Sequence, residues 1–190
     1  MEPGLPRTVA GRALIGMFDS SVQAEGGPKA EESAAEPAGD WPRYFHVLVA
    51  IDETRASAFA LRHVVPYVLD QRSNLTLLAV VPHPPRIAAV GGVSPVQMAR
   101  EMERGAADRL RRVAAGLPRG LPVTTILRHG DPAVEILELA HERSVDLICM
   151  GARGLGRVGG ALLGSVSTAV LHRSHVPVVV FHPPANARSI

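Results

Sequence analysis

Apolar residues follow two patterns along this chain. Some form short, mainly apolar runs, and others recur every three or four positions over longer segments. The short runs lie at residues 45–51, 75–81, 122–127, 145–150 and 176–181, and polar residues interrupt the third (Thr124 and Thr125) and the fourth (Asp146). Runs of this length, rich in β-branched residues, are typical of strands buried on both faces of a parallel sheet. The segments with helical spacing lie at residues 55–69, 95–115, 133–143 and 165–173. The pattern therefore predicts five strands and four helices.

The alternation of these strands and helices predicts the fold class. Short connections and right-handed crossovers favour a single doubly wound, five-stranded parallel sheet with helices on both faces, a Rossmann-like α/β fold. The order along the chain leaves the order of the strands across the sheet open. In this architecture ligands bind outside the carboxyl ends of the strands, where the winding reverses. We therefore expect functional residues just after the first, second and fourth strands.

Polar residues and prolines mark where three of the helices begin. Thr54 is placed to cap the first helix. Ser94 and Pro95 read as the cap and the first-turn proline of the second helix. Asp131, followed by Pro132, reads as the cap of the third. These signals support the helix assignments independently of the apolar spacing.

The two ends of the chain differ from its middle. Residues 20–40 consist mainly of Ala, Glu, Gly, Pro and Ser, a composition that cannot bury enough apolar surface to offset the entropy of ordering. We therefore expect residues 1–43 to form a flexible N-terminal extension, residues 44–184 to form one domain, and residues 185–190 to be a C-terminal tail. A short apolar segment at residues 13–18 interrupts the extension and could dock on another surface.

Composition and charge exclude several classes of function. The formal net charge is only +2 and the basic residues are spread along the chain, which argues against a nucleic-acid-binding surface. Cys149 is the only cysteine, so no internal disulfide can form, and a reducing cytoplasm is the expected location. No apolar run approaches the roughly 20 residues that span a bilayer, and the N-terminal apolar segment is too short for a signal peptide. We expect no membrane insertion and no export.

The glycine-rich segment after the fourth strand is the strongest candidate for chemistry. Six glycines fall between Gly151 and Gly164, and Ser165 follows at the start of a helix. Free backbone amides leading into a helix N-terminus form a cradle for anions, so a phosphate chain fits here. The segment is not a Walker A loop, because no lysine follows Gly164. It is not the dinucleotide fingerprint either, because that loop follows the first strand.

The spacing of this segment resembles a known motif. Gly151, two residues, Gly154, nine residues, then Gly164 and Ser165 is similar to the ATP-binding motif of the universal stress protein family. The resemblance extends over about residues 44–184. Besides the loop, three segments carry it, at residues 49–52, 130–132 and 146–151. The resemblance implies a fold of the adenine nucleotide alpha hydrolase type and an adenine nucleotide, ATP, as the ligand.

The resemblance also implies roles for individual positions. Asp52 is similar to the acidic residue that meets the ribose or, through a metal, the phosphates, and Ala50 packs near it. Val80 is similar to the residue whose backbone recognises adenine. The residues expected to hold ribose and phosphates are Gly151, Gly154, Gly164, Ser165, Val166 and Ser167, with Met150 lining the floor. Mg²⁺ is a possible companion of ATP, and the sequence identifies neither its ligands nor a catalytic residue.

The sequence allows two interpretations for several charged residues and histidines. Glu53 adds a second carboxylate beside Asp52, which could help a metal or hinder a bare anion. Arg153 and Arg157 in the loop are better explained as solvated side chains than as phosphate ligands. The eight histidines show no metal-ligand motif. His172 and His175 could share a metal, but favourable charge at a helix C-terminus is the simpler account.

The last predicted strand and the motif together suggest what the protein does. An apolar edge from Val176 to Phe181 favours association, and the resemblance implies a homodimer through this strand. The leading hypothesis is an ATP-binding sensor or regulator in a stress response. Two alternatives stay open: a slow Mg²⁺-dependent ATPase or nucleotidyl-transfer enzyme using the same loop, and a nucleotide-free dimeric interaction module.

Overall fold

A computed structural model describes residues 43–83, 94–152 and 163–183. The strands are β1 (His46–Ala50), β2 (Asn74–Val81), β3 (Val123–His129), β4 (Leu147–Gly151) and β5 (Val178–Phe181). The helices are α1 (Arg55–Gln71), α2 (Pro95–Ala115), α3 (Pro132–Glu142) and α4 (Ser165–Arg173). The predicted alternation of strands and helices is confirmed, with boundaries that shift by one to two residues at most ends.

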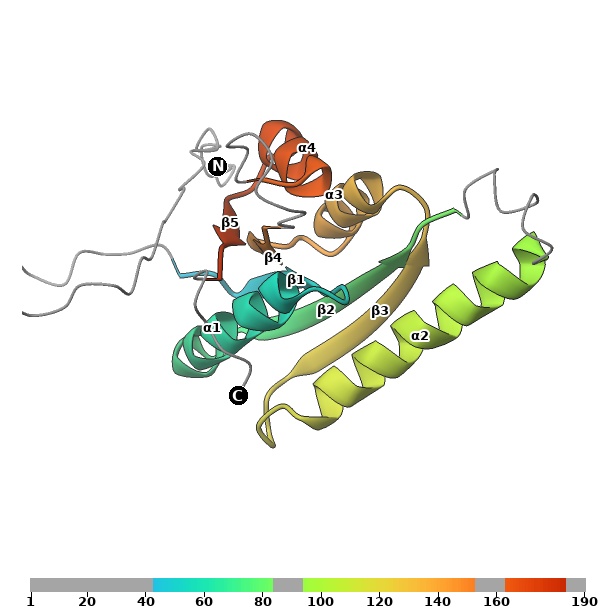
Figure 1. The fold of residues 1–190 in the computed structure, drawn as a ribbon. Helices are drawn as coiled ribbons and strands as arrows, with labels where there is room; N and C mark the ends of the chain where they lie inside the picture. Colours follow the sequence, from blue (N-terminus) through green and yellow to red (C-terminus); the bar gives the residue numbers. More distant parts are fainter. Residues whose placement is uncertain (1–42, 84–93, 153–162, 184–190) are drawn as a thin grey trace, which may run out of the picture.

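All pairings in the sheet are parallel, in the order β3-β2-β1-β4-β5 (Figure 1). From β1 the chain winds outward through β2 to β3, then crosses back over β1 to form β4 and β5 on the other side. The predicted doubly wound parallel sheet is therefore confirmed. The crossing also settles the strand order that the sequence left open.

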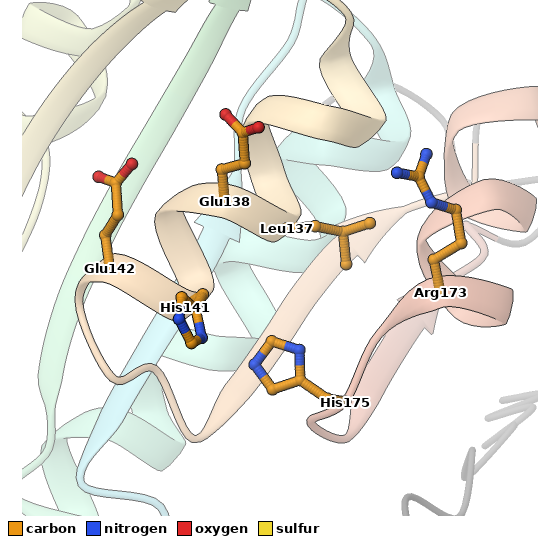
Figure 2. Close-up of a pocket in the computed structure, with 6 residues that line it drawn as sticks. All are labelled: Leu137, Glu138, His141, Glu142, Arg173 and His175. Atoms are coloured by element: carbon orange, nitrogen blue, oxygen red, sulfur yellow. The ribbon is translucent and has the colours of Figure 1, made fainter.

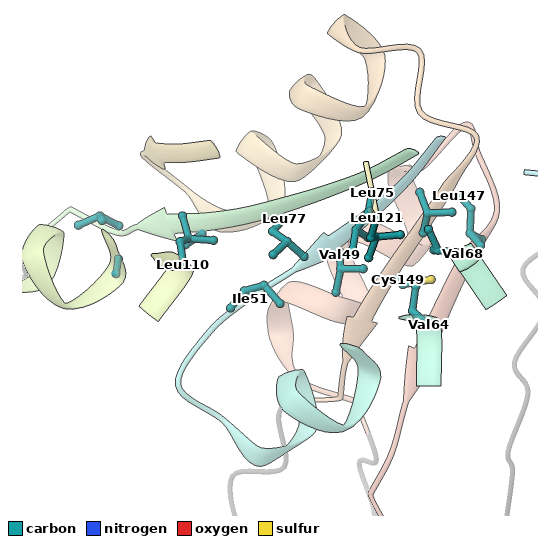
Figure 3. Close-up of a cluster of buried hydrophobic side chains, with 14 residues drawn as sticks. Val49, Ile51, Val64, Val68, Leu75, Leu77, Leu110, Leu121, Leu147 and Cys149 are labelled. Atoms are coloured by element: carbon teal, nitrogen blue, oxygen red, sulfur yellow. The ribbon is translucent and has the colours of Figure 1, made fainter. Parts of the chain in front are cut away.

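The helices cover the sheet as two pairs. Helix α1 packs against β4 and β5 and α2 against β2 and β3, whereas α3 and α4 pack together on the opposite face. Strand residues alternate between the two layers: Val47 and Val49 lie in the cluster under α1 and α2, and Leu48 lies in the cluster under α3 and α4. Figure 3 shows the first of these clusters, with Val49 among its labelled side chains. A central strand with cover on both sides is apolar nearly throughout, as β1 and β4 are, whereas the edge strand β3 carries two threonines and is only partly buried.

The helix starts follow the predicted caps with one exception. The Thr54 hydroxyl accepts a hydrogen bond from the Ser57 amide, and the Asp131 carboxylate accepts from the Ala133 and Val134 amides. Ser94 occupies the cap position of α2 but its side chain makes no cap hydrogen bond. Within the described ranges, no helix is long and apolar enough to cross a membrane.

Candidate functional site

The winding of the sheet reverses between the parallel neighbours β1 and β4. From β1 the chain adds strands on one side of the sheet, and from β4 it adds β5 on the other side. After β1 the chain turns through Asp52 into α1, and after β4 it passes Gly151 and Ala152 toward the segment that precedes α4. Because the helices run back against the strands, the N-termini of α1, α3 and α4 lie at this same edge of the sheet. The edge combines a topological switch point with three helix N-termini.

Three of the predicted site residues share one face of the sheet at this edge. Ala50, Val80 and Met150 all belong to the apolar cluster under α3 and α4, together with Val166 from α4. Met150 is buried, whereas Ala50 and Val80 are half-buried. The strands thus bring together side chains that are a hundred positions apart in the sequence and give the edge an apolar wall.

Val80 occupies an extension of β2 beyond the end of β1. The pairing of β1 with β2 ends at Ala50 opposite Leu78, and the Ile51 amide donates to the Leu78 carbonyl at 2.7 Å. Strand β2 continues beside β3, with Val80 opposite Arg128. On the side away from β3, Val80 therefore lies past the last residue of β2 that pairs with β1.

The Asp52 carboxylate organises the turn that follows β1. Its Oδ1 accepts hydrogen bonds from the Thr54 amide at 2.8 Å and from the Thr54 hydroxyl at 2.6 Å. The Asp52 amide donates to the Ser57 hydroxyl at 3.0 Å. Asp52 therefore fixes the shape of the β1–α1 turn whatever else it binds, by a local side-chain turn that orients Thr54, the cap of α1.

Gly151 is required by packing at the end of β4. A Cβ atom at this position would lie 2.3 Å from the Ala56 carbonyl carbon and 2.5 Å from the Ser57 amide nitrogen. Both atoms belong to the backbone of the first turn of α1, which cannot move aside without displacing the helix. The sequence assigned Gly151 to the ligand loop, and the structure gives it an independent structural role.

The N-terminus of α4 presents Gly164 and Ser165. Gly164 is the cap residue, and Ser165 is exposed at the first helical position. Ser167 is only 1% exposed, and its hydroxyl donates to the Gly164 carbonyl at 3.0 Å. The Ser167 hydroxyl thus holds the cap in place. Gly154, Arg153 and Arg157 lie outside the described residues.

Arginines near this edge face carboxylates. Arg109 of α2 lies 3.4 Å from Glu53, so Glu53 has a cation beside it. Arg128 of β3 bridges to Glu135 and Glu142 of α3. The hydrogen bond from Arg128 lowers the pKa of Glu142, and the same contact raises the pKa of Arg128. Sequence reasoning missed all three ion pairs because the partners come from different segments of the chain.

A cavity lies at the opposite edge of the sheet, between the C-terminal ends of α3 and α4. It measures about 450 Å³ and is lined by Leu137, Glu138, His141, Glu142, Arg173 and His175 (Figure 2). The rings of His141 and His175 meet edge to face at 5.7 Å between centroids. The sequence search compared His175 with His172, its neighbour in sequence, and could not find this pair.

Metal-binding and redox chemistry have few candidates in the described part of the chain. Residues 43–83, 94–152 and 163–183 contain no group of three or more His, Cys, Asp or Glu side chains that could hold a metal ion. Cys149 is 2% exposed, and burial raises the pKa of its thiol to about 12. Cys149 is therefore an inert packing residue.

Comparison with known proteins decides the family. A model of the family described as "Universal stress protein family" matches residues 43–182. The chain belongs to the universal stress protein family. The universal stress protein Rv2005c of Mycobacterium tuberculosis is 31% identical over 176 residues, which cover 92% of this chain and 58% of the relative. This universal stress protein thus spans about half the length of its mycobacterial relatives, and 48% of one from Mycolicibacterium smegmatis.

Solved structures agree with the fold. The protein MJ0577 has 26% sequence identity and a TM-score of 0.65, and the match covers 76% of this chain and 100% of that one. A universal stress protein in complex with cAMP has 27% identity and a TM-score of 0.50, with 74% and 98% of the two chains covered. The universal stress protein fold, with sheet order 3-2-1-4-5 and four helices, is therefore established.

Proposed function

We propose that this universal stress protein binds an adenine nucleotide, ATP, at the carboxyl edge of the sheet. The single observation that carries the proposal is the meeting of Ala50, Val80 and Met150 on one face at the switch point, beside the N-terminus of α4. Switch points of doubly wound sheets are where such folds bind ligands. A solved relative in complex with cAMP supports an adenine nucleotide in particular.

The adenine ring lies, in this proposal, against the apolar wall. Ala50, Met150 and Val166 supply apolar surface from β1, β4 and α4. The backbone of Val80, in the extension of β2 beyond β1, hydrogen-bonds the edge of the base. An apolar slot with one backbone recognition point suits a flat heterocycle whose edge carries both donors and acceptors.

The phosphates lie at the N-terminus of α4, where backbone amides lack partners within the helix. Gly151, Gly154, Gly164 and Ser165 provide amides and a hydroxyl, and Ser167 acts indirectly by holding the Gly164 carbonyl. Asp52 receives the ribose hydroxyls, since it lies in the turn that follows β1. Anions at a helix N-terminus gain from the helix dipole as well as from the amides.

Mg²⁺ fits this site only as a companion of the phosphates. Asp52 already accepts two hydrogen bonds from Thr54, and Glu53 faces Arg109. Mg²⁺ is commonly held by one or two carboxylates plus phosphate oxygens and water, so Asp52 is the residue that would join it. Bound there, the ion would neutralise phosphate charge.

The biological role that we propose is that of a cytoplasmic sensor or regulator whose nucleotide occupancy is read by a partner. Strand β5 is the last strand of the sheet, and among the residues that the structure describes no strand pairs with its outer edge. Edge strands pair readily with another chain. We propose that two copies associate through β5, which would place two nucleotide sites in one assembly.

Calorimetric titration of the full chain with ATP, with and without Mg²⁺, tests the proposal. We expect saturable one-to-one binding, with cAMP and AMP competing and GTP competing poorly, because Val80 reads the adenine edge. Phosphate release, measured in parallel on wild type and Asp52→Asn, separates binding from enzymatic turnover. An absence of binding to all adenine nucleotides would overturn the proposal and favour the nucleotide-free interaction module.

A further inference from the structure

A second, smaller cavity lies on the other face of the sheet, between α1 and the strands β4 and β5. It measures about 250 Å³. Its rim is formed by Tyr44, His63, Tyr67 and Phe181, and its floor includes Cys149. We call it the aromatic hollow. It is separate from the nucleotide site, whose apolar wall lies on the α3 and α4 face.

Aromatic side chains concentrate around this hollow in a chain that is only 4% aromatic. The rings of Tyr44 and Tyr67 lie 6.3 Å apart between centroids. The ring of His63 lies 4.0 Å from that of Phe59 and 5.9 Å from that of Phe181. Aromatic residues are enriched at protein interfaces, where they supply large contact area at a low entropy cost. The hollow therefore has the composition of a docking site.

The size of the hollow indicates a side chain as its occupant. Small-molecule sites usually measure roughly 300–1,000 Å³, and the hollow is smaller. The sequence contains two further aromatic residues besides those of the described part, Phe18 and Trp41, and both lie upstream of Arg43. Phe18 ends the apolar segment 13–18, which is followed by a stretch with hardly a large apolar residue.

We propose that residues 13–18 of the same chain dock on the aromatic hollow, with Phe18 as the side chain that enters it. The upstream segment joins the domain at Arg43, directly before Tyr44, which itself lines the hollow. A random chain of the length of residues 19–43 spans roughly 25–30 Å, which is ample for this reach. The tether gives the segment an effective concentration in the millimolar range, so a weak apolar contact suffices.

Charges near the hollow favour the same occupant. Arg62 lies over the Phe59 ring and Arg43 over the Phe45 ring, so guanidinium groups flank the aromatic cluster. The stretch between the docking segment and the domain is acidic, with Asp19, Glu25, Glu31, Glu32, Glu36 and Asp40 against a single basic residue, Lys29. An acidic tether that passes these two arginines, which lie beside the hollow rather than on its rim, is electrostatically complementary to them. A second copy of the chain could bring the same acidic residues to these arginines only with its own N-terminal extension.

Disulfide trapping tests the docking directly. His63→Cys places an exposed thiol on the rim, and it is combined with either Met17→Cys or Ala30→Cys in the full chain at low concentration. If the extension did not dock, the shorter loop between positions 30 and 63 would close more readily than the loop between 17 and 63. The 30–63 disulfide would then form at least as fast as the 17–63 disulfide. Docking predicts the reverse, with the 17–63 disulfide forming at least tenfold faster, and Phe18→Ala in that background removing the advantage.

Each outcome of this experiment decides the matter. Equal rates for the two pairs, or a faster 30–63 pair, would overturn the proposal. A 17–63 disulfide that forms between two chains would assign the hollow to a second copy and would also overturn it. Cys149 serves as an internal control, because its buried thiol should appear in neither disulfide. The result is independent of ATP binding, since no nucleotide is added.

Discussion

Replacing Gly151 with alanine is expected to lower the free energy of unfolding by about 2–3 kcal/mol. The added Cβ would meet backbone atoms of Ala56 and Ser57 at 2.3 to 2.6 Å, and backbone cannot rotate away as a long side chain can. Urea unfolding followed by circular dichroism measures the loss. The full destabilisation should appear in nucleotide-free protein, because it arises from helix packing.

Gly105→Ala is the matched control for this prediction. Gly105 lies within α2, and a Cβ there would meet nothing within 4 Å. Alanine at an open helical position should raise the free energy of unfolding by about 0.5–1 kcal/mol. If Gly151→Ala left the free energy of unfolding as high as Gly105→Ala does, the result would contradict the close approach of α1 to β4. The expected result also warns against Gly151 variants as probes of ligand binding.

Ser165→Asp is expected to weaken ATP binding about a hundredfold without harming the fold. Ser165 is exposed at the first position of α4, where a carboxylate is favourable to the helix by about 0.3–1 kcal/mol. The same carboxylate would face the phosphates in our proposal, and like charges brought together cost several kcal/mol. Calorimetric titration with ATP and thermal unfolding of the nucleotide-free protein give the two readouts.

Ser144→Asp provides the control for net charge. Ser144 precedes β4 at the opposite edge of the sheet, and its φ of 49° is a conformation that aspartate tolerates well. This variant carries the same added charge and should bind ATP like wild type. Equal loss of affinity in both variants would point to a general charge effect, and unchanged affinity in Ser165→Asp would remove α4 from the phosphate site.

The elements of the fold were predictable because their signals are local. The apolar runs, the cap of α1 at Thr54 and the start of α3 at Asp131 and Pro132 each depend on residues that are close together in the sequence. The ends were less accurate where pairing decides them. The last strand was expected from Val176 but begins at Val178, because its pairing with β4 starts at Ile148 opposite Val178. A strand end depends on the neighbouring strand, which the sequence pattern does not specify.

The residues of the candidate site could be proposed from the sequence, but their geometry could not. The glycine spacing singled out Gly151 and Gly164, yet only the packing of α1 on β4 shows that Gly151 has a steric role. The burial of Ser167 follows from the face of α4 that meets the sheet. The meeting of His141 with His175 depends on how α3 and α4 pack. Such contacts join residues that are distant in the sequence, and no local pattern encodes them.

The most direct test of the nucleotide site is a two-dimensional amide NMR titration of the full chain with ATP. We predict the largest shift changes at Asp52, Val80, Ala152 and Ser165, around the switch point between β1 and β4. Shifts centred on His141 and His175 would instead place ATP in the cavity at the opposite edge of the sheet. That result, or an absence of shifts at saturating ATP, would contradict the proposed site.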